Sequence, residues 1–208
     1  MATLLYSATT SLDGFIAGPG GDMSWLTPYL EPDPAVDELI TRVGACLVGG
    51  RTFRGADPYA GTEGEGEVFG GGWEGPQFVL TRTPPADPVP GTTFLTDLHE
   101  AVSAARAAAG EGYVNVLGAA TARSCLEAGE LDEVLVFIAP VLLGDGVRLF
   151  ERPGGVPVPL ERIDVGASPL ATHVWFRVPP QPAAAPDPFD EPVPFEQLLR
   201  GGSADRLT

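Results

Sequence analysis

Three short segments carry residues that could hold phosphate groups, and each follows an apolar run typical of a buried strand. The residues concerned are Gly50, Arg51, Thr52, Thr81, Arg82, Gly118, Ala119, Ala120 and Thr121. Glycine lets a phosphate approach the backbone, and a helix N-terminus offers free N–H groups at the positive end of its dipole. Arginine adds a bidentate phosphate donor. Each segment alone is also typical of a simple turn, but together they predict a site for an anionic ligand.

The second and third segments favour a dinucleotide. Arg82 could hold the 2′-phosphate that distinguishes NADP from NAD. Residues 118–121 suit a pyrophosphate lying on a helix N-terminus, although the G-x-G-x-x-G pattern of the ordinary dinucleotide fold is absent. Because open α/β sheets bind ligands beyond the carboxyl ends of their strands, we expect all three segments to meet at one sheet edge.

Strand-like and helix-like segments alternate along residues 1–178, which predicts a single α/β domain with a largely parallel sheet. The expected strands are residues 3–9, 45–50, 77–82, 113–118 and 133–144. The expected helices begin near residues 34, 98 and 119, the first with Asp33 as N-cap and Val36, Leu39, Ile40 and Val43 as its apolar stripe. Two late strands, near 158–166 and 170–178, predict an antiparallel edge. Residues 55–76 are glycine-rich without periodicity, which predicts a mobile loop.

Charge excludes several classes of function. All twelve basic residues are arginines, and 28 acidic residues bring the net charge to −16. A chain without lysine cannot bind phosphate through a P-loop or form a lysine Schiff base. A pI near 4.3 argues against a nucleic-acid partner, which requires clustered positive charge. No apolar run reaches the ~18 residues of a membrane span, and no signal peptide is recognisable, so we expect a cytoplasmic protein without a membrane partner.

Other chemistries find little support in the residue types. Cys46 and Cys125 are too few for a disulfide framework and are expected to be buried free thiols in a reducing compartment. His99 and His173 have no partner at ligand spacing, so no metal is expected. Hydrolase catalysis is unsupported because no serine lies in a G-x-S-x-G motif.

Composition changes near Pro179. Residues 179–208 contain seven prolines and carry a net charge of −3, a composition typical of a flexible acidic tail. Phe195, Leu198 and Leu199 could form one apolar helical turn that docks on the domain.

Four segments, in this order, resemble those of the dihydrofolate reductase-like family. They are SLDGFIAG, GGRTF, FVLTRTPP and LDEVLVFIAPVLLGDGVRLF. The closest resemblance is to the reductase domain of bifunctional riboflavin-biosynthesis deaminase-reductases and to their stand-alone relatives, over about residues 3–178. The resemblance implies a mixed, mainly parallel central sheet flanked by helices, with an antiparallel edge. It also implies an NADPH cofactor, a small-molecule substrate and a homodimer. The apolar run Val134–Ile138 could supply part of the dimer contact.

The resemblance also assigns residues to roles. It places residues 50–52 at a phosphate-contacting turn, residues 81–82 at the adenosine 2′-phosphate and residues 118–121 at the pyrophosphate. The substrate-side candidates are Asp13, Gly14, Trp25, Pro140 and Gly144, with Asp13 also the catalytic candidate. Two positions depart from the family pattern. Ala119 replaces a second glycine, and Leu30 stands where folate reductases place a carboxylate.

The function implied is NADPH-dependent reduction like that of 5-amino-6-(5-phosphoribosylamino)uracil in riboflavin synthesis, by hydride transfer to a small imine or carbonyl-like substrate. The alternatives are a dihydrofolate or pterin-type reductase, and a non-catalytic ligand-binding or interaction protein on the same fold. The residues do not separate these substrates, because residues 55–76 carry few specific groups.

Overall fold

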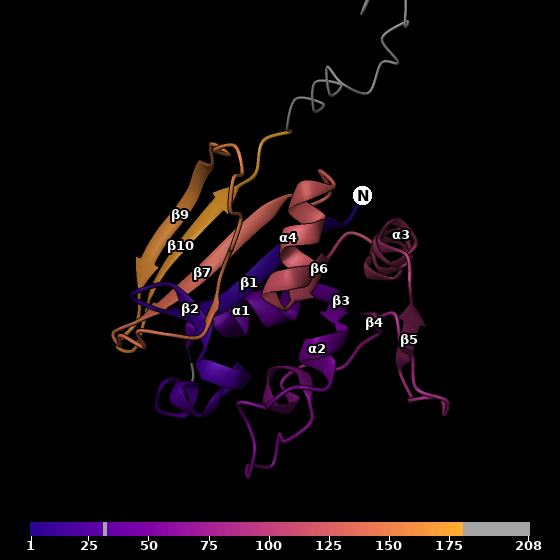
Figure 1. Ribbon diagram of the computed structural model, residues 1–208, viewed down its shortest axis with the longest axis horizontal. Coiled ribbons are helices and arrows are strands. Elements are labelled where there is room, and N and C mark those ends of the chain that lie inside the picture. Colours follow the sequence, from indigo (N-terminus) through magenta and orange to yellow (C-terminus); the bar gives the residue numbers. More distant parts are fainter. Residues whose placement is uncertain (31–32, 181–208) are drawn as a thin grey trace, which may run out of the picture.

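An eight-stranded sheet forms the centre of the structure, a computed structural model that describes residues 1–30 and 33–180 (Figure 1). In sheet order the strands are β5 (Thr92–Leu95), β4 (Gln77–Leu80), β3 (Val43–Gly49), β6 (Tyr113–Leu117), β1 (Thr3–Ser11), β7 (Glu133–Ala139), β10 (Thr172–Arg177) and β9 (Glu161–Ala167). Neighbours from β5 to β7 are parallel, whereas β10 is antiparallel to both β7 and β9. The predicted mixed, mainly parallel sheet with an antiparallel edge is confirmed.

Helices cover both faces of this sheet. The α-helices are α1 (Pro34–Arg42), α2 (Gly50–Phe53), α3 (Leu98–Ala109) and α4 (Ala119–Glu127). Short 3-10 turns occur at η1 (Pro19–Gly21), η2 (Ser24–Tyr29) and η3 (Val68–Gly71), and β2 (Phe15–Ala17) pairs with β8 (Val147–Arg148) in a small second sheet. Asp33 and Asp97 cap α1 and α3 by accepting from Ala35 N and Glu100 N, both at 2.9 Å, and the cap at Asp33 is the one predicted above.

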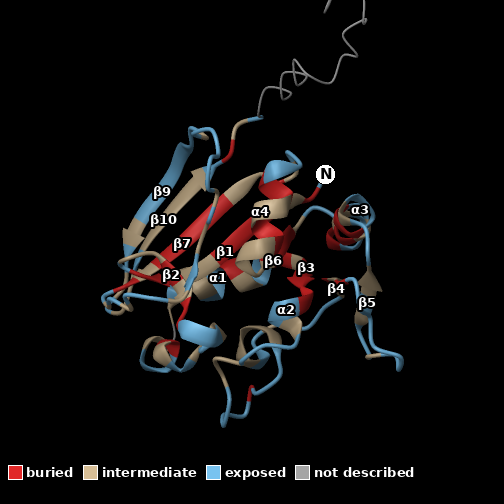
Figure 2. Cartoon of the chain, viewed as in Figure 1, coloured by how far each residue is buried: buried red, intermediate tan, exposed pale blue. Residues whose placement is uncertain are grey.

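The core consists of two apolar layers, one on each face of the sheet. Alternate residues of a strand point to opposite faces, so Leu4 and Tyr6 of β1 pack with α3 and α4, while Leu5 packs with α1. Figure 2 shows the buried residues concentrated in the central strands and in the inner sides of α3 and α4, with β9 exposed at the edge. Cys46 and Cys125 are buried and unpaired, as expected.

Several elements differ from the sequence prediction. Val43 begins β3 instead of ending the apolar stripe of α1, and β7 ends before Pro140, which has no N–H to donate to a ladder. The pairs β4–β5 and β2–β8 were not predicted, because β5 has four residues and β8 two, too short for a recognisable pattern. Residues 55–76 contain η3 and internal hydrogen bonds, such as Tyr59 N to Asp57 Oδ1 at 2.9 Å.

Strand β7 is paired by β1 and by β10, and its residues Val134–Phe137 are only 2–7% exposed, so most of its apolar run is covered within the chain. The homodimer therefore stays a prediction that rests on the resemblance. Within residues 1–30 and 33–180, no helix is long and apolar enough to cross a bilayer. The tail segment 181–208, including the predicted apolar turn, lies outside the described residues.

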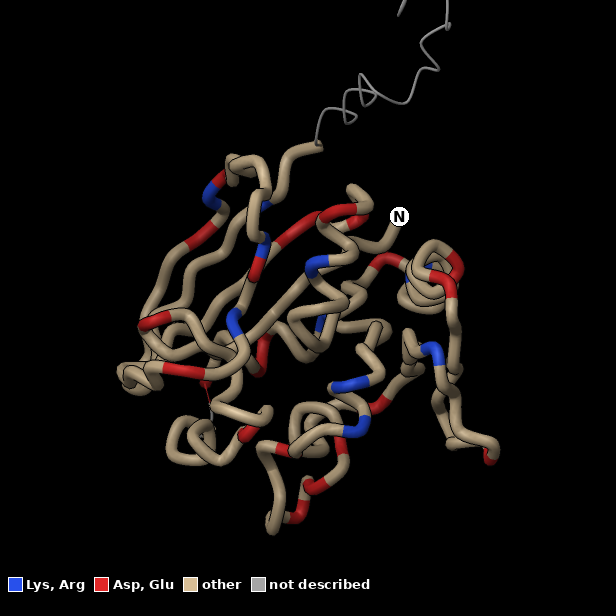
Figure 3. Tube along the Cα trace, in the orientation of Figure 1, with Lys and Arg blue, Asp and Glu red and all other residues tan. Residues whose placement is uncertain are grey.

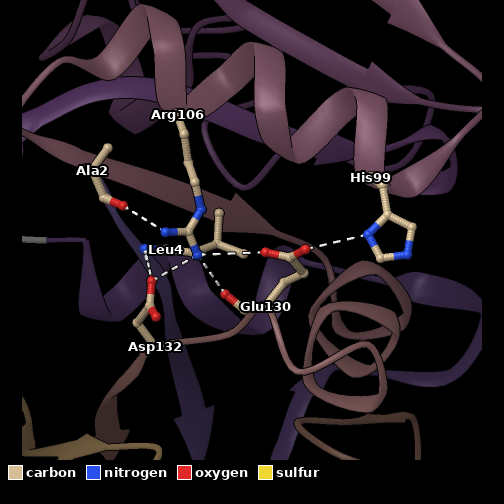
Figure 4. A network of polar contacts seen from close by, with 6 residues as sticks. All are labelled: Ala2, Leu4, His99, Arg106, Glu130 and Asp132. Carbon is tan, nitrogen blue, oxygen red and sulfur yellow. Dashed lines mark hydrogen bonds and ion pairs between the residues drawn. The ribbon is translucent and has the colours of Figure 1, made fainter. Parts of the chain in front are cut away.

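Arg106 on α3 joins the N-terminal strand to the segment between α4 and β7 (Figure 4). Its guanidinium donates to Ala2 O at 2.9 Å, Glu130 O at 2.8 Å and Asp132 Oδ2 at 2.9 Å. The same Asp132 oxygen accepts from Leu4 N at 2.7 Å, so one carboxylate holds α3 to β1. The Arg106 side chain is only 16% exposed, and its charge therefore depends on these partners.

Arg106→Gln should lower the free energy of unfolding by about 2–4 kcal/mol, because several acceptors lose their donor at once. A thermal melt followed by circular dichroism measures the loss, roughly 2–4 °C per kcal/mol for a chain of this size. The matched control is Arg177→Gln, which removes an ion pair whose side chains are 57% and 61% exposed and should cost less than about 1 kcal/mol. Equal shifts in the two variants would contradict the role assigned to Arg106.

Candidate active site

The sheet opens beyond the carboxyl end of β6. Strand β1 pairs with β6 only over Thr3–Tyr6, but it continues beside β7 to Ser11. In the described sheet the later residues of β1 therefore have no strand neighbour on the β6 side. A cleft of about 1930 Å³ lies at this opening, and Ser7, Ala8 and Thr9 of β1 line it. The cleft thus lies beyond the carboxyl ends of parallel strands, the edge at which the sequence predicts a ligand site.

Three turns meet at this edge through contacts between glycine and threonine. A Cβ on Gly49 would collide with Thr121 Oγ1, and one on Gly118 would collide with Thr52 Oγ1. A Cβ on Gly50 would lie 2.7 Å from Thr81 Oγ1. The turns after β3, β4 and β6 can approach this closely only because each glycine lacks a side chain. The structure thus brings together all three predicted phosphate-contacting segments.

The conformations of Gly118 and Ala119 explain why the turn after β6 forms without a second glycine. Gly118 is the N-cap of α4 with φ +107°, a conformation that L side chains rarely adopt. Ala119 is already the first helical residue, where a Cβ is accommodated. The first intrahelical bond runs from Ala122 N to Gly118 O at 3.0 Å. The N–H groups of Ala119, Ala120 and Thr121 thus have no acceptor within the helix and are available to an anion.

Arginines supply the positive charge at this edge. Arg51 and Arg54 lie one helical turn apart on and just after α2, and Arg82 follows β4; all three line the cleft. No carboxylate of the described residues lies within ion-pair distance of any of them. Arg54 donates to Thr81 Oγ1 at 3.4 Å. Sequence reasoning missed Arg54, although its spacing of three residues from Arg51 places both on one helix face.

Asp13 ties two loops together. Its Oδ1 accepts from Ser11 Oγ at 2.6 Å and from Leu143 N at 3.1 Å, and its Oδ2 accepts from Gly144 N at 2.7 Å. The Ser11 hydroxyl above all, and then the two backbone N–H groups, lower the pKa of Asp13 to about 2. The carboxylate is therefore ionised at neutral pH, with its lone pairs occupied by the protein. This environment suits the positioning of loops better than proton transfer, and the catalytic role stays a prediction.

The other substrate-side candidates lie around the cleft without lining it in the described chain. Gly14 and Gly144 occupy turns with φ +87° and +79°, and Pro140 is exposed after β7. Trp25 lies in η2, and its indole nitrogen is buried without a hydrogen-bond partner among the described residues. Its ring centroid is 6.3 Å from that of Tyr29, which does line the cleft. The substrate-binding roles of these residues stay predictions.

Histidine and cysteine contribute nothing to this edge. His99 on α3 contacts Glu130 at 3.2 Å, and His173 on β10 contacts Asp164 at 3.6 Å. The part of the chain that the structure describes holds no group of three or more His, Cys, Asp or Glu side chains that could bind a metal ion. The site therefore consists of backbone N–H groups, hydroxyls, arginines and carboxylates.

This sheet, with its split between β1 and β6 and three glycine-containing turns that meet at its strand ends, defines a dihydrofolate reductase-like protein. More particularly, the chain belongs to the RibD C-terminal domain family, whose model matches residues 2–168. The resemblance noted in the sequence is confirmed at the level of the family. The sequence has no match among curated proteins.

Solved structures share the fold. A putative riboflavin biosynthesis protein from Shewanella sp. PV-4 has a TM-score of 0.65 and 23% identity, over 86% of this chain and 99% of that one. A diaminohydroxyphosphoribosylaminopyrimidine deaminase/5-amino-6-(5-phosphoribosylamino)uracil reductase from Thermotoga maritima gives 0.61 and 20%, over 85% of this chain and 56% of its own. Dihydrofolate reductase from Enterococcus faecalis, complexed with NADP(H), gives 0.52 and 16%, over 85% and 95%. At these identities the likeness establishes the fold alone.

Gly118→Ala should destabilise the protein and separate the turns after β3 and β6. The new Cβ would collide with Thr52, and the positive φ of this position would strain the alanine backbone. Gly129→Ala is the matched control, since Gly129 also has positive φ, +71°, but has nothing within 4 Å of its Cβ position. Strain alone should cost roughly 1–2 kcal/mol in the control. We expect Gly118→Ala to cost at least ~1 kcal/mol more in urea unfolding. A smaller cost than in the control would show that the turns do not interlock.

The hydrogen bonds of the Asp13 carboxylate should make the stability of the protein depend on pH in the acid range. Its pKa in the folded protein, about 2, lies below the ordinary 3.8, so its stabilisation is complete above the ordinary value and is lost as the pH falls towards 2. Asp13→Asn lacks this contribution at every pH. Melting temperatures measured between about pH 5 and pH 2 should therefore fall more steeply in the unmutated protein than in Asp13→Asn. The control, Asp87→Asn at an exposed loop position, should follow the unmutated protein.

Proposed function

We propose that this protein is an NADPH-dependent reductase that transfers hydride to a small imine or carbonyl-like substrate. The observation that carries the proposal is the convergence on one cleft of three glycine-containing turns and three arginines that have no ion pair among the described residues. In a chain of net charge −16, three such arginines at one place favour an anionic ligand. Membership of the RibD C-terminal domain family supports a reductase.

The residues fit a phosphorylated dinucleotide. A Cβ at Gly49, Gly50 or Gly118 would fill the space in which the turns approach one another. Arg82 would hold the adenosine 2′-phosphate, with Arg51 beside it, and the N–H groups at the start of α4 would hold the pyrophosphate. When bound, the cofactor supplies the hydride and its two electrons.

The chain's own residues would bind and orient the ligands and exclude water from the cleft. The open edge of β1 at Ser7–Thr9 lines the cleft, as do the three glycine-containing turns and α1. Ser7 Oγ donates to Asn115 Oδ1 at 2.7 Å, which fixes this hydroxyl with its lone pairs available to a ligand donor. Val36 and Ile40 of α1 line the cleft with apolar surface that excludes water from the reacting carbon.

The resemblance proposes 5-amino-6-(5-phosphoribosylamino)uracil as the substrate, the compound in the name of the Thermotoga maritima protein. In that reaction type, hydride adds to the ring-opened C1′ of the ribosylamine. Only the chemistry of a C=N or C=O acceptor is carried over to the proposal, because the T. maritima chain is 20% identical.

Titration with NADPH and NADH, followed by nicotinamide fluorescence, tests the cofactor. NADPH should bind at least ~10-fold more tightly than NADH, equivalent to about 1.4 kcal/mol. Arg82→Ala should remove most of this preference without changing the melting temperature by more than a degree or two, because the side chain is exposed. Arg162→Ala, an exposed arginine on β9, is the control and should keep the preference. Equal affinity for both nucleotides, or no binding of either, would contradict the assignment of NADPH as the cofactor.

A further inference from the structure

One wall of the cleft is a loop whose hydrogen bonds are internal. This cleft loop, residues 55–72, follows α2 and lines the cleft with both of its arms, residues 55–59 and 66–70. Every hydrogen bond that residues 56–72 make in the described structure joins two residues of that same segment. Figure 1 shows the loop, in purple, projecting beyond α2. Such a segment has few bonds to lose when it moves away from the domain.

The carboxylate of Asp57 joins the two arms. Its Oδ1 accepts from Tyr59 N at 2.9 Å, and its Oδ2 accepts from Gly66 N at 2.5 Å. The arms also pack closely, because a Cβ on Gly64 would collide with Gly70, and one on Gly70 would collide with the Tyr59 ring. The cleft loop is therefore a compact body of its own, as in an Ω-loop.

Ion pairs do not attach this body to the domain. Residues 55–76 contain five acidic residues and no basic one, and Figure 3 shows the acidic positions along the loop, below the basic positions of α2. None of these carboxylates lies within ion-pair distance of a cation in the described chain. Glu65 instead accepts from Gly61 N at 2.8 Å, which is a further bond inside the loop.

Glycines lie at both ends of the cleft loop. Gly55 directly follows α2, and the three consecutive residues 69–71 have positive φ, from 54° to 85°. Glycine can absorb the changes of φ and ψ that a hinge requires. The chain is fixed again at Trp73, whose indole donates to Val43 O at 2.8 Å. A movement of the loop would therefore end at this tryptophan.

Apolar contacts hold the loop against the domain. Val68 and Phe69 are half-buried and pack on the apolar layer at the α1 side of the sheet. The Cβ position of Gly72 lies 3.6 Å from Ile40 Cδ1 of α1. Phe69 is also the one non-glycine residue described with positive φ, which costs free energy and offsets part of what its contacts contribute. The attachment is therefore weak compared with the bonding inside the loop.

We propose that the cleft loop is a lid that opens and closes as one body on its glycine ends, and that Asp57 is the positioning residue that holds its arms together. Its internal bonds make the body rigid, while half-buried apolar contacts let it open. Closure covers a ligand on the α1 side of the cleft and excludes water from it. The ligand is that of the proposed function, NADPH with its substrate, and this part of the inference rests on that function.

Hydrogen exchange of the ligand-free protein, measured by NMR, tests whether the loop is one body. The amides of Tyr59, Gly61 and Gly66 should exchange through one common opening, far more often than the amides of β6. Asp57→Ala should speed the exchange of all three by at least ~10-fold, because the arms separate. Faster exchange at Tyr59 and Gly66 alone would show only the loss of their own acceptor and would overturn the single body.

Glu63→Ala is the matched control, since Glu63 is an exposed residue of the same loop and its side chain makes no hydrogen bond in the described structure. It removes the same charge and should leave the three amides unchanged. The melting temperature of Asp57→Ala should stay within about 2 °C of the unmutated protein, because no bond of Asp57 leaves the loop. A larger fall would show that the loop supports the domain and is not a lid.

Stopped-flow binding of NADPH, followed by nicotinamide fluorescence, tests closure. A lid that closes after binding makes the observed rate level off at high NADPH concentration, whereas one-step binding gives a straight line. Asp57→Ala should raise the dissociation rate constant at least ~5-fold, and Asp57→Asn, which keeps one acceptor oxygen, should raise it less. Glu63→Ala should leave it unchanged. A straight line, or unchanged dissociation in Asp57→Ala, overturns the lid.

The two measurements separate this inference from the function on which it rests. Absence of NADPH binding would contradict the proposed function and, with it, closure over that cofactor. Exchange in the ligand-free protein would still decide whether the loop is one body held by Asp57. Tight NADPH binding with one-step kinetics would leave the reductase intact and overturn the lid alone.

Discussion

The contact of three threonines with three glycines at the carboxyl edge of the sheet is the constraint on which the site depends. Thr52 meets Gly118, Thr81 meets Gly50, and Thr121 meets Gly49, so the turns after β3, β4 and β6 form one surface. Threonine suits these contacts because its χ1 is restricted and its hydroxyl takes little space. Close packing at the strand ends brings the start of α4 and the arginines of α2 and β4 to the same cleft. A side chain at any of the glycines would separate them.

A second constraint is the early end of β6 relative to β1. Strand β1 has nine residues and β6 has five, so the sheet splits where β6 turns into α4. Ladder pairing to β7 keeps β1 in place beyond the split, and the Asp13 carboxylate holds the loop that follows β1 to the turn after β7. The cleft is thus bordered by a strand that is paired on its β7 side and by loops that the Asp13 carboxylate joins. An opening of this kind needs no empty space in the core to form.

Local signals predicted much of this arrangement. Apolar runs that end in glycine or arginine mark β3, β4 and β6, and the position of ligands at their carboxyl ends follows from the handedness of α/β connections. The family motifs added the expectation of a mixed sheet flanked by helices, whereas the strand order was not predicted, because no local pattern contains it. The split of the sheet, the β4–β5 pair and the partners of Asp13 depend on register between distant segments, so they could not be predicted. Arg54 could have been found from its spacing to Arg51. Trp25 and Gly144 illustrate the opposite case, since a motif placed them near the substrate and the structure places them outside the lining of the cleft.

Two kinds of charged group line the cleft. Arg51, Arg54 and Arg82 follow strand ends whose close approach depends on glycine. The carboxylates of Asp33, Asp57 and Asp145 are oriented by their own loops, because they accept from the backbone N–H groups of Ala35, Tyr59 and Gly146. Side chains on loops can be substituted without moving the strands. A side chain at Gly49, Gly50 or Gly118 would instead push the turns apart. The positions that hold the three turns together are therefore more constrained in sequence than the charged side chains that line the cleft.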